Sequence, residues 1–231
     1  IRPSYVLGGQ GMRIAINKDE VERYVNDIWR LLPDNEILLD RFIEDGIEVD
    51  CDAIRDGDEV WISGIMQHIE PAGVHSGDST AVLPPYSLSE TVQTTIRRYV
   101  TEIANRLEVL GLINVQLVVK GETVYVIEAN PRASRTVPFV AKATGVSVAK
   151  IATKVVLGEK LATFRAQGLL ESTLQGFAIK EPVFSWDKFP EVPKELGPEM
   201  KSTGEAIAFV ENLTDEHFSR PYEMRNLYLS R

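Results

Sequence analysis

The sequence has 231 residues and a formal net charge of −9, with 44% hydrophobic and 26% charged residues. These values are typical of a globular protein of one domain or two small ones, and they exclude a fibre or a disordered tail. The acidic balance disfavours general nucleic-acid binding, and no apolar run approaches the roughly 18 residues of a membrane span.

The first part of the chain alternates short strands with one helix. An Asn cap, early acidic residues and apolar positions three and four apart predict the helix. Alternating acidic and apolar residues, returning after Asp56-Gly57-Asp58, predict a hairpin. The expected elements are a strand end with a glycine turn over residues 2–11, a helix over Asn17–Arg30, and strands over Glu36–Asp40, Glu48–Arg55 and Glu59–Ile69.

The rest of the chain begins with a long loop. Glu70–Tyr86 shows neither a helical nor a strand period, and long loops in compact domains tend to be functional. The next elements are a helix over Ser89–Leu110, strands over Leu112–Val119 and Thr123–Ala129, a loop over Asn130–Thr136, helices around Val140–Ala143 and Val148–Leu157, short strands over Gly176–Lys180 and Ala206–Val210, and a peripheral helix or tail over Leu213–Arg231. Strand pairs alternating with helices favour the α+β class with mainly antiparallel sheets.

Three polar residues on the second strand pair form a candidate metal site. If the hairpin closes around Gly121, Gln116 and Glu128 can face the same side of the sheet, and Asn130 shares the face of Glu128. A carboxylate and two amides offer the oxygen ligands that suit Mg²⁺. The competing interpretation is a strand end whose polar residues cap the next turn.

Two further motifs could contact anions. Arg132 and Arg135 lie three apart on a loop, where two guanidinium groups could hold an anionic substrate or a phosphoryl group in transfer. The small, glycine-flanked loop Gly73–Ser79 can offer backbone N–H groups to phosphates. Surface salt bridges are the simpler interpretation of the two arginines, and His75 alone is weak evidence for a site.

The stretch from Asp40 to Glu48 joins two expected strands. Its backbone could contact a planar base, with Glu48 on ribose hydroxyls, although an ordinary turn with solvated acids is the simpler interpretation. Cys51, the single cysteine, is expected in the strand core, and it excludes an intrachain disulfide and fits a reducing compartment such as the cytoplasm. The acids expected to form a solvated face are Glu44, Asp45, Asp50 and Asp52.

Taken in order, six blocks of the sequence resemble the large subunit of carbamoyl-phosphate synthetase, nearly without gaps from Ile1 to about Val210. The blocks are RPSYVLGG, LLDRFIED with GIEVDCDAI, GIMQHIEPAGVHSGDS, LINVQ, VIEANPRASRTVPFVAKATGV and LGPEMKSTGE. The resemblance implies the ATP-grasp fold, in which two α+β subdomains clasp ATP. It places a nucleotide-lid subdomain over about residues 1–72, the C-terminal subdomain up to residue 210, and a peripheral tail over residues 211–231.

The family carries two homologous ATP-grasp halves, of which the first phosphorylates bicarbonate and the second carbamate. Tyr5-Val6-Leu7, Ser76 and Thr136–Phe139 resemble the second half. The implied activity is ATP-dependent phosphorylation of carbamate within glutamine-dependent carbamoyl-phosphate synthesis, for pyrimidine and arginine biosynthesis. The implied partner is the small glutamine amidotransferase subunit, and the implied cofactors are ATP with Mg²⁺ or Mn²⁺. The chain opens inside a motif, so we expect a piece of a longer protein that is inactive in isolation.

The resemblance implies nucleotide contacts along the first part of the chain. Arg2 would contact phosphates, Arg41 and the backbone near Ile43 would line the adenine site, and Glu48 would bind the ribose. The turn over residues 8–11 would act as a lid that excludes water. The inner wall of the nucleotide pocket would consist of Gly73, Val74, His75 and Ser76.

The resemblance also implies a metal and acceptor site. Gln116 and Glu128 would hold one ion, and Glu128 and Asn130 a second. Arg132 and Arg135 would orient carbamate and stabilise the transferring phosphoryl group. Two alternatives stay open: another ATP-grasp ligase such as a biotin-dependent carboxylase, and a non-catalytic assembly module that kept the fold.

Overall fold

The structure is a computed structural model that describes residues 1–4, 11–33 and 35–214. Its elements are β1 (Arg2–Pro3), α1 (Lys18–Leu31), β2 (Ile37–Leu38), β3 (Ile47–Arg55), β4 (Val60–His68), β5 (Ala81–Leu83), α2 (Glu90–Arg106), β6 (Gly111–Lys120), β7 (Thr123–Asn130), α3 (Thr136–Thr144), α4 (Val148–Val156), α5 (Leu161–Ala166), β8 (Phe177–Val183) and β9 (Gly204–Val210). The predicted turn over residues 8–11 and the predicted tail fall largely outside the described ranges.

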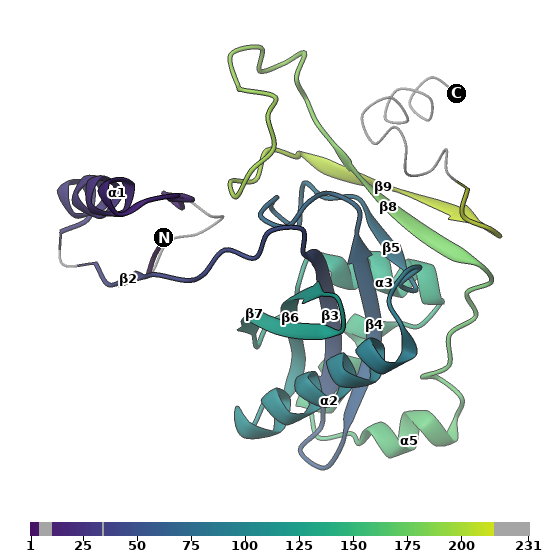
Figure 1. The fold of residues 1–231 in the computed structure, drawn as a ribbon. Coiled ribbons are helices and arrows are strands. Elements are labelled where there is room, and N and C mark those ends of the chain that lie inside the picture. The colour runs from purple at the N-terminus through teal and green to yellow at the C-terminus, as the bar shows by residue number, and fades with distance from the viewer. Residues whose placement is uncertain (5–10, 34, 215–231) are drawn as a thin grey trace.

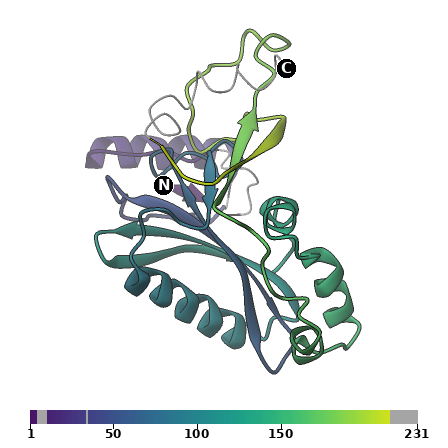
Figure 2. The ribbon, with the colours of Figure 1, turned by 90° about the vertical axis from the view of Figure 1, so that its right-hand side faces the viewer.

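A seven-stranded sheet in the order β7-β6-β3-β4-β5-β8-β9 dominates the structure, and each of its pairs is antiparallel (Figure 1). Figure 2 shows α2 along one face of the sheet and α3, α4 and α5 on the other. Strands β1 and β2 form a separate two-stranded sheet, which lies near α1 at the side of the main body. The arrangement confirms the predicted α+β class with antiparallel sheets.

The two faces of the seven-stranded sheet belong to two different hydrophobic cores. Val49, Cys51 and Ala53 of β3 pack with the buried stripe of α2. Ile54 of β3 and Met66 of β4 pack with α3, α4 and α5 on the opposite face. Since successive side chains of a strand point to opposite faces, this division fixes which residues of β3 share a side.

Local sequence signals explain where the main elements begin. Ser89 caps α2 by accepting a hydrogen bond from the backbone N–H of Val92, as predicted for the longest helix. At the β3–β4 hairpin, the Asp56 carboxylate accepts the backbone N–H groups of Asp58 and Glu59, and Gly57 adopts a left-handed conformation (φ +97°). The predicted turn Asp56-Gly57-Asp58 is thereby confirmed.

The structure adds two elements that the sequence did not indicate. Strand β5 lies inside the predicted loop Glu70–Tyr86 and pairs with β4 and β8, and its three residues are too short to display a strand period. Helix α5 spans six residues, which is less than two helical turns. Helix α3 also starts at Thr136, earlier than its apolar stripe suggested.

The expected subdomain boundary near residue 72 stays a prediction, and the sheet topology shows how the strands around it pair. β3 and β4 precede that position, but β3 is hydrogen-bonded to β4 on one side and to β6 on the other. The change from the small sheet to the large one therefore falls between β2 and β3. Among the described residues, no helix is long and apolar enough to cross a membrane.

Candidate functional site

The face of the sheet that points away from α2 carries a row of polar side chains on β3, β4, β6 and β7. On β3 these residues alternate with the α2-facing core, and the register of the sheet aligns Asp50 with Gln116, and Gln116 with Glu128. We call this row the polar face. Its members are Glu48, Asp50, Asp52, His68, Asn114, Gln116, Glu128 and Asn130.

The candidate metal ligands come together in the β6–β7 hairpin. Gln116 lies directly opposite Glu128, a bulge follows Gln116, and Asn130 donates from Nδ2 to Oε1 of Glu128 at 2.8 Å. Glu128 is exposed, and Gln116 Nε2 donates to Ser76 Oγ at 3.2 Å. The predicted clustering of Gln116, Glu128 and Asn130 is confirmed.

This donor set fits a hard divalent cation that is held by few protein groups. Mg²⁺ is usually bound by one or two carboxylates, while water and phosphate oxygens complete its octahedron. The side-chain amides of Gln116 and Asn130 donate hydrogen bonds through their N–H₂ groups, and each also has an oxygen that can bind a cation. In the described ranges no group of three or more His, Cys, Asp or Glu side chains could hold a metal ion, which disfavours an all-protein cage.

A buried ion pair lies next to Gln116 in the sheet, because Asp50 is directly opposite Gln116. Asp50 Oδ2 and His68 Nε2 are 2.9 Å apart, and both side chains are almost completely buried. Burial opposes ionisation of both groups, but their mutual hydrogen bond and charge outweigh it. The pKa of Asp50 is therefore lowered and the pKa of His68 is raised. Nδ1 of His68 is buried without a hydrogen-bond partner among the described residues.

Asp52 connects this network to the arginine-bearing loop. Its carboxylate accepts hydrogen bonds from Ser134 Oγ at 2.8 Å and from Thr136 Oγ1 at 2.5 Å. Asn114 donates from Nδ2 to both Asp50 at 3.1 Å and Asp52 at 2.9 Å. Burial raises the pKa of Asp52 to about 6, although these hydrogen bonds work in the opposite direction. A carboxylate inside the sheet thus holds the segment that begins α3.

The loop over residues 73–79 faces the polar face from the end of β4. The backbone N–H of Gly73, which has φ +100°, points to Glu48 Oε2 at 3.4 Å. Burial raises the pKa of Glu48. His75 Nδ1 accepts the backbone N–H of Gly77 at 3.0 Å, and burial followed by the charge of Arg135 lowers the pKa of His75. The structure brings this loop next to Gln116, which bonds to Ser76.

The two candidate arginines occupy different positions on the loop before α3. Arg135 reaches the 73–79 loop, because its Nη1 contacts Met200 Sδ and lies where a Cβ on Gly77 would be only 2.9 Å away. Arg132 is exposed and bonds locally to the Ala133 carbonyl at 3.1 Å. Arg135 therefore already points into the site, whereas Arg132 lies on its rim.

The segment between β2 and β3 borders the site on its other side. Arg2 Nε lies 2.7 Å from Asp40 Oδ2, which places Arg2 beside the segment that holds Arg41 and Ile43. Arg41 is exposed and Ile43 is half-buried. The ring of Phe42 covers Gly73, where a Cβ would lie 3.4 Å from it. The segment thus reaches the 73–79 loop through Phe42.

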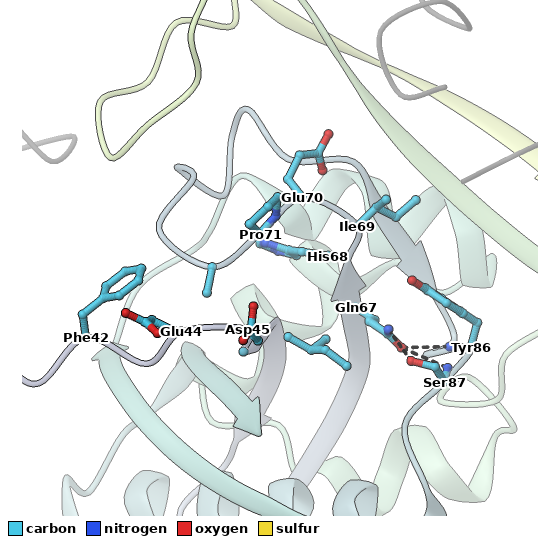
Figure 3. A pocket seen from close by; sticks show the side chains of 13 residues that line it. Phe42, Glu44, Asp45, Gln67, His68, Ile69, Glu70, Pro71, Tyr86 and Ser87 are labelled. Carbon is cyan, nitrogen blue, oxygen red and sulfur yellow. Dashed lines mark hydrogen bonds between the residues drawn. The ribbon is translucent and has the colours of Figure 1, made fainter. Parts of the chain in front are cut away.

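A cavity of about 460 Å³ lies behind this segment (Figure 3). It is lined by Phe42 and Ile47, by the end of β4, and by Tyr86 and Ser87, which both hydrogen-bond to Gln67. The lining includes His68 of the polar face as well as Ile47, but it does not include Gln116, Glu128 or Asn130. The cavity is not the space between the predicted metal ligands and the 73–79 loop.

The expected solvated face is wrong for two of its four acids. Glu44 and Asp45 are exposed, but Asp50 and Asp52 are only 2% and 1% exposed. Both are buried because hydrogen-bond donors from β4, β6 and the α3 loop reach them. Cys51 is fully buried, as predicted. The sequence analysis missed Asp50, Asp52, His68 and Asn114 as site residues, and only their shared strand period could have indicated them.

The chain resembles known proteins in sequence over most of its length. Residues 1–164 match the family described as carbamoyl-phosphate synthase L chain, ATP binding domain. The carbamoyl phosphate synthase large chain of Methanothermobacter thermautotrophicus is 53% identical over 216 residues, 92% of this chain and 20% of that protein. The one from Pasteurella multocida is 55% identical over 208 residues, 90% of this chain and 19% of that protein. The chain thus spans about a fifth of the length of these relatives.

Solved structures share the fold at much lower identity. A biotin carboxylase from Campylobacter jejuni in a β-γ-ATP complex has a TM-score of 0.70 at 16% identity, over 89% of this chain and 52% of that one. The biotin carboxylase domain of the Hydrogenobacter thermophilus 2-oxoglutarate carboxylase, in complex with MgADP and bicarbonate, has a TM-score of 0.69 at 17% identity, over 91% and 52%. These similarities establish the predicted ATP-grasp fold.

Proposed function

The chain belongs to the carbamoyl-phosphate synthase large-chain family, and we propose that its polar face is a site where ATP phosphorylates carbamate to carbamoyl phosphate. The observation that carries the proposal is the placement of Glu128 opposite Gln116, with the 73–79 loop and Arg135 beside them. One surface thereby combines oxygen ligands for a cation, backbone groups for phosphates and a guanidinium for an anionic acceptor.

Gln116, Glu128 and Asn130 would hold Mg²⁺, or Mn²⁺ in its place. When bound, such an ion neutralises charge on the phosphoryl oxygens of the nucleotide. The contribution of this chain is to fix the ligands. Gln116 and Glu128 face each other across β6 and β7, and Asn130 orients the Glu128 carboxylate by a hydrogen bond. A loss of the Glu128 charge would weaken both expected ions.

The nucleotide would lie between the 73–79 loop and the segment that joins β2 to β3. Glu48 is positioned at the start of β3 for the ribose hydroxyls, and Gly73 permits close backbone approach. Arg41 and the backbone near Ile43 would contact the base, and Arg2 the phosphates. The remaining wall would be formed by Val74, His75 and Ser76.

Arg132 and Arg135 would bind the acceptor. A carbamate oxygen attacks the γ-phosphorus while the bond from that phosphorus to the bridging oxygen breaks, which releases ADP and forms carbamoyl phosphate. The arginines orient the anionic carbamate and stabilise the charge on the transferring group. The assignment to the carbamate-phosphorylating half rests on Ser76 and Thr136–Phe139, which resemble the second half.

In this proposal the nitrogen of carbamate comes from ammonia that a small glutamine amidotransferase subunit releases. The product then serves pyrimidine and arginine biosynthesis. Both points follow from the sequence resemblance over a chain that spans about a fifth of its relatives.

The proposal is tested by two partial reactions of the intact protein. ATP synthesis from carbamoyl phosphate and Mg-ADP reports the carbamate step, and bicarbonate-dependent ATP hydrolysis reports the other step of the family. Arg135→Ala is expected to lower the first about 10²–10³-fold and to spare the second. Loss of the bicarbonate-dependent step with retention of ATP synthesis would assign this chain to the other half. Loss of neither would remove Arg135 from the site.

A further inference from the structure

The block LGPEMKSTGE resembles the family, but among its residues only Met200, as a contact of Arg135, belongs to the site described so far. Its middle residues, 197–202, lie in the connection between β8 and β9, which Figure 1 shows as a long excursion from the sheet. We call residues 197–202 the strap. Although more than a hundred positions separate the two segments in sequence, the strap is hydrogen-bonded to the 73–79 loop.

Asp78 makes two hydrogen bonds of this connection. Its Oδ2 accepts the backbone N–H of Lys201 at 2.8 Å, and its Oδ1 accepts the backbone N–H of Ser202 at 2.8 Å. Asp78 is 0% exposed, so both bonds are shielded from water. Charge-assisted hydrogen bonds to a buried carboxylate are among the stronger ones in proteins. The carboxylate therefore fixes the distance between the two segments.

Two further bonds join the same segments. The backbone N–H of His75 donates to the Gly197 carbonyl at 2.8 Å, and Ser202 Oγ donates to the Gly77 carbonyl at 2.9 Å. Both ends of the strap thus contact the turn that holds His75. These bonds use backbone groups of the loop, so they determine its conformation directly.

Strand β8 supports the loop from the same side. Lys180 Nζ donates to the Ser76 carbonyl at 2.9 Å, and Lys180 is almost completely buried. Ser76 in turn accepts the hydrogen bond from Gln116. The position of one candidate metal ligand is therefore linked to β8 through a single residue of the loop.

The strap also reaches the acceptor side of the site. Met200 Sδ contacts Arg135 Nη1, and both atoms lie against Gly77, where a Cβ would be 3.1 Å from Met200 Sδ. Any side chain at position 77 would displace one of them. Gly77 thus lets the strap, the loop and Arg135 meet at one point.

We propose that the strap is a positioning element of the nucleotide site and that Asp78 is its positioning residue. Asp78 holds the 73–79 loop in the conformation that presents its backbone to the phosphates, and Met200 holds Arg135 beside it. The nucleotide loop and the acceptor arginine then form one unit, so a disturbance of the strap affects both. This inference rests on the proposed function for the identity of the ligand.

The test compares Asp78→Asn with Asp56→Asn in the intact protein. Asp56 is a matched control, since it is also a buried carboxylate that accepts backbone N–H groups, of Asp58, Glu59 and Leu161, but it lies at the β3–β4 hairpin, away from the site. Two quantities are measured: the dissociation constant of Mg-ADP by calorimetry, and amide hydrogen exchange over residues 73–79 without nucleotide.

Asp78→Asn is expected to weaken Mg-ADP binding about tenfold and to speed exchange in the 73–79 loop. Asp56→Asn is expected to change neither. Wild-type values for Asp78→Asn, or equal changes in both variants, would overturn the proposal. If Asp78→Asn does not fold, Ser202→Ala removes only the bond to Gly77. It should weaken binding about two- to threefold and speed exchange at the loop, and unchanged exchange would overturn the proposal.

The hydrogen-exchange measurement and the ATP-synthesis assay together separate this inference from the proposed function. A wild-type protein that makes no ATP from carbamoyl phosphate and Mg-ADP contradicts the proposed function. The exchange rates of the two variants still decide whether the strap positions the loop, because they are measured without any substrate.

Discussion

The two faces of strand β3 have opposite characters, although their residues alternate along one short segment. Val49, Cys51 and Ala53 point to α2 and are fully buried in an apolar core. Asp50 and Asp52 point to the other side and are buried almost as completely. The α2 face is held by apolar packing, whereas Asp50 and Asp52 on the other face are held by hydrogen bonds and one ion pair, next to the apolar Ile54. Burial alone therefore does not distinguish core from site.

The difference between the two faces of β3 shows how a sheet can hold polar side chains in its buried interior. Buried carboxylates are costly unless donors satisfy them, and here neighbouring strands supply the donors in register. Asn114 on β6 serves Asp50 and Asp52 together, and His68 on β4 pairs with Asp50. The polar face therefore depends on specific partners, whereas the α2-facing core depends on volume and shape.

The largest effect on stability is expected for Asp50→Asn. The variant leaves the buried His68 without its counter-charge, and breaking a buried ion pair by removing one partner costs about 3–5 kcal/mol. Urea denaturation of the chain measures this loss. A second substitution, His68→Gln, should recover part of it because it removes the orphaned charge. A loss below about 1 kcal/mol for Asp50→Asn would show that the pair is not ionised in the folded state.

The largest effect on activity is expected for Glu128→Gln. The substitution keeps the shape of the side chain and removes the charge that faces Gln116, so carbamoyl-phosphate formation by the intact protein should fall about 10²–10³-fold. Circular dichroism should show an unchanged fold, because Glu128 is exposed. Near-normal turnover with an unaltered Mg²⁺ dependence would exclude Glu128 as a ligand.

A pH-dependent effect is expected at Asp52. Its folded-state pKa of about 6 lies above the model-peptide value of 3.8, so the folded state keeps a proton that the unfolded state has lost between these pH values. Relative to Asp52→Asn, the free energy of unfolding of the wild type should fall by about 2.4 kcal/mol between pH 4 and pH 7. Urea denaturation of both proteins at each pH measures the difference. A constant difference would mean that Asp52 has an ordinary pKa.

The smallest effect is expected on the α2-facing side. Cys51→Ala removes one buried sulfur atom from an apolar core and should cost about 1 kcal/mol of stability without changing carbamoyl-phosphate formation. Burial also raises the pKa of the Cys51 thiol far above its ordinary value, so a thiol reagent should label it only after unfolding. Rapid labelling of the native protein, or a large loss of activity, would contradict the division between the two faces.

Much of the fold could be predicted, because apolar residues recur at regular helical or strand spacing in the main elements. The stripe of α2 and the two long hairpins follow directly from helical and strand spacing. Strand β5 could not be predicted in this way, since its identity depends on pairing with β4 and β8, which are distant in sequence. The seven-stranded order likewise depends on long-range pairing that no local pattern contains.

The candidate site was predicted only where residues lie close in sequence. Gln116, Glu128 and Asn130 belong to one hairpin, so their shared face follows from strand geometry. The burial of Asp52 depends on donors more than sixty positions away, and that of Asp50 on His68 as well as on Asn114. Alternation with apolar residues suits a solvated face equally well. The contact between Asp78 and the strap could not be predicted for the same reason, because the two are more than a hundred positions apart in sequence.

The most direct test of the central claim is a crystal structure of the intact protein with Mg²⁺ and a non-hydrolysable ATP analogue. It distinguishes the space beside Gln116 and Glu128 from the cavity of about 460 Å³ at the end of β4. The account predicts an ion about 2.0–2.1 Å from oxygens of Gln116 and Glu128, with the phosphates against the 73–79 loop. A nucleotide bound in the cavity behind Phe42, with no ion at Glu128, would contradict it.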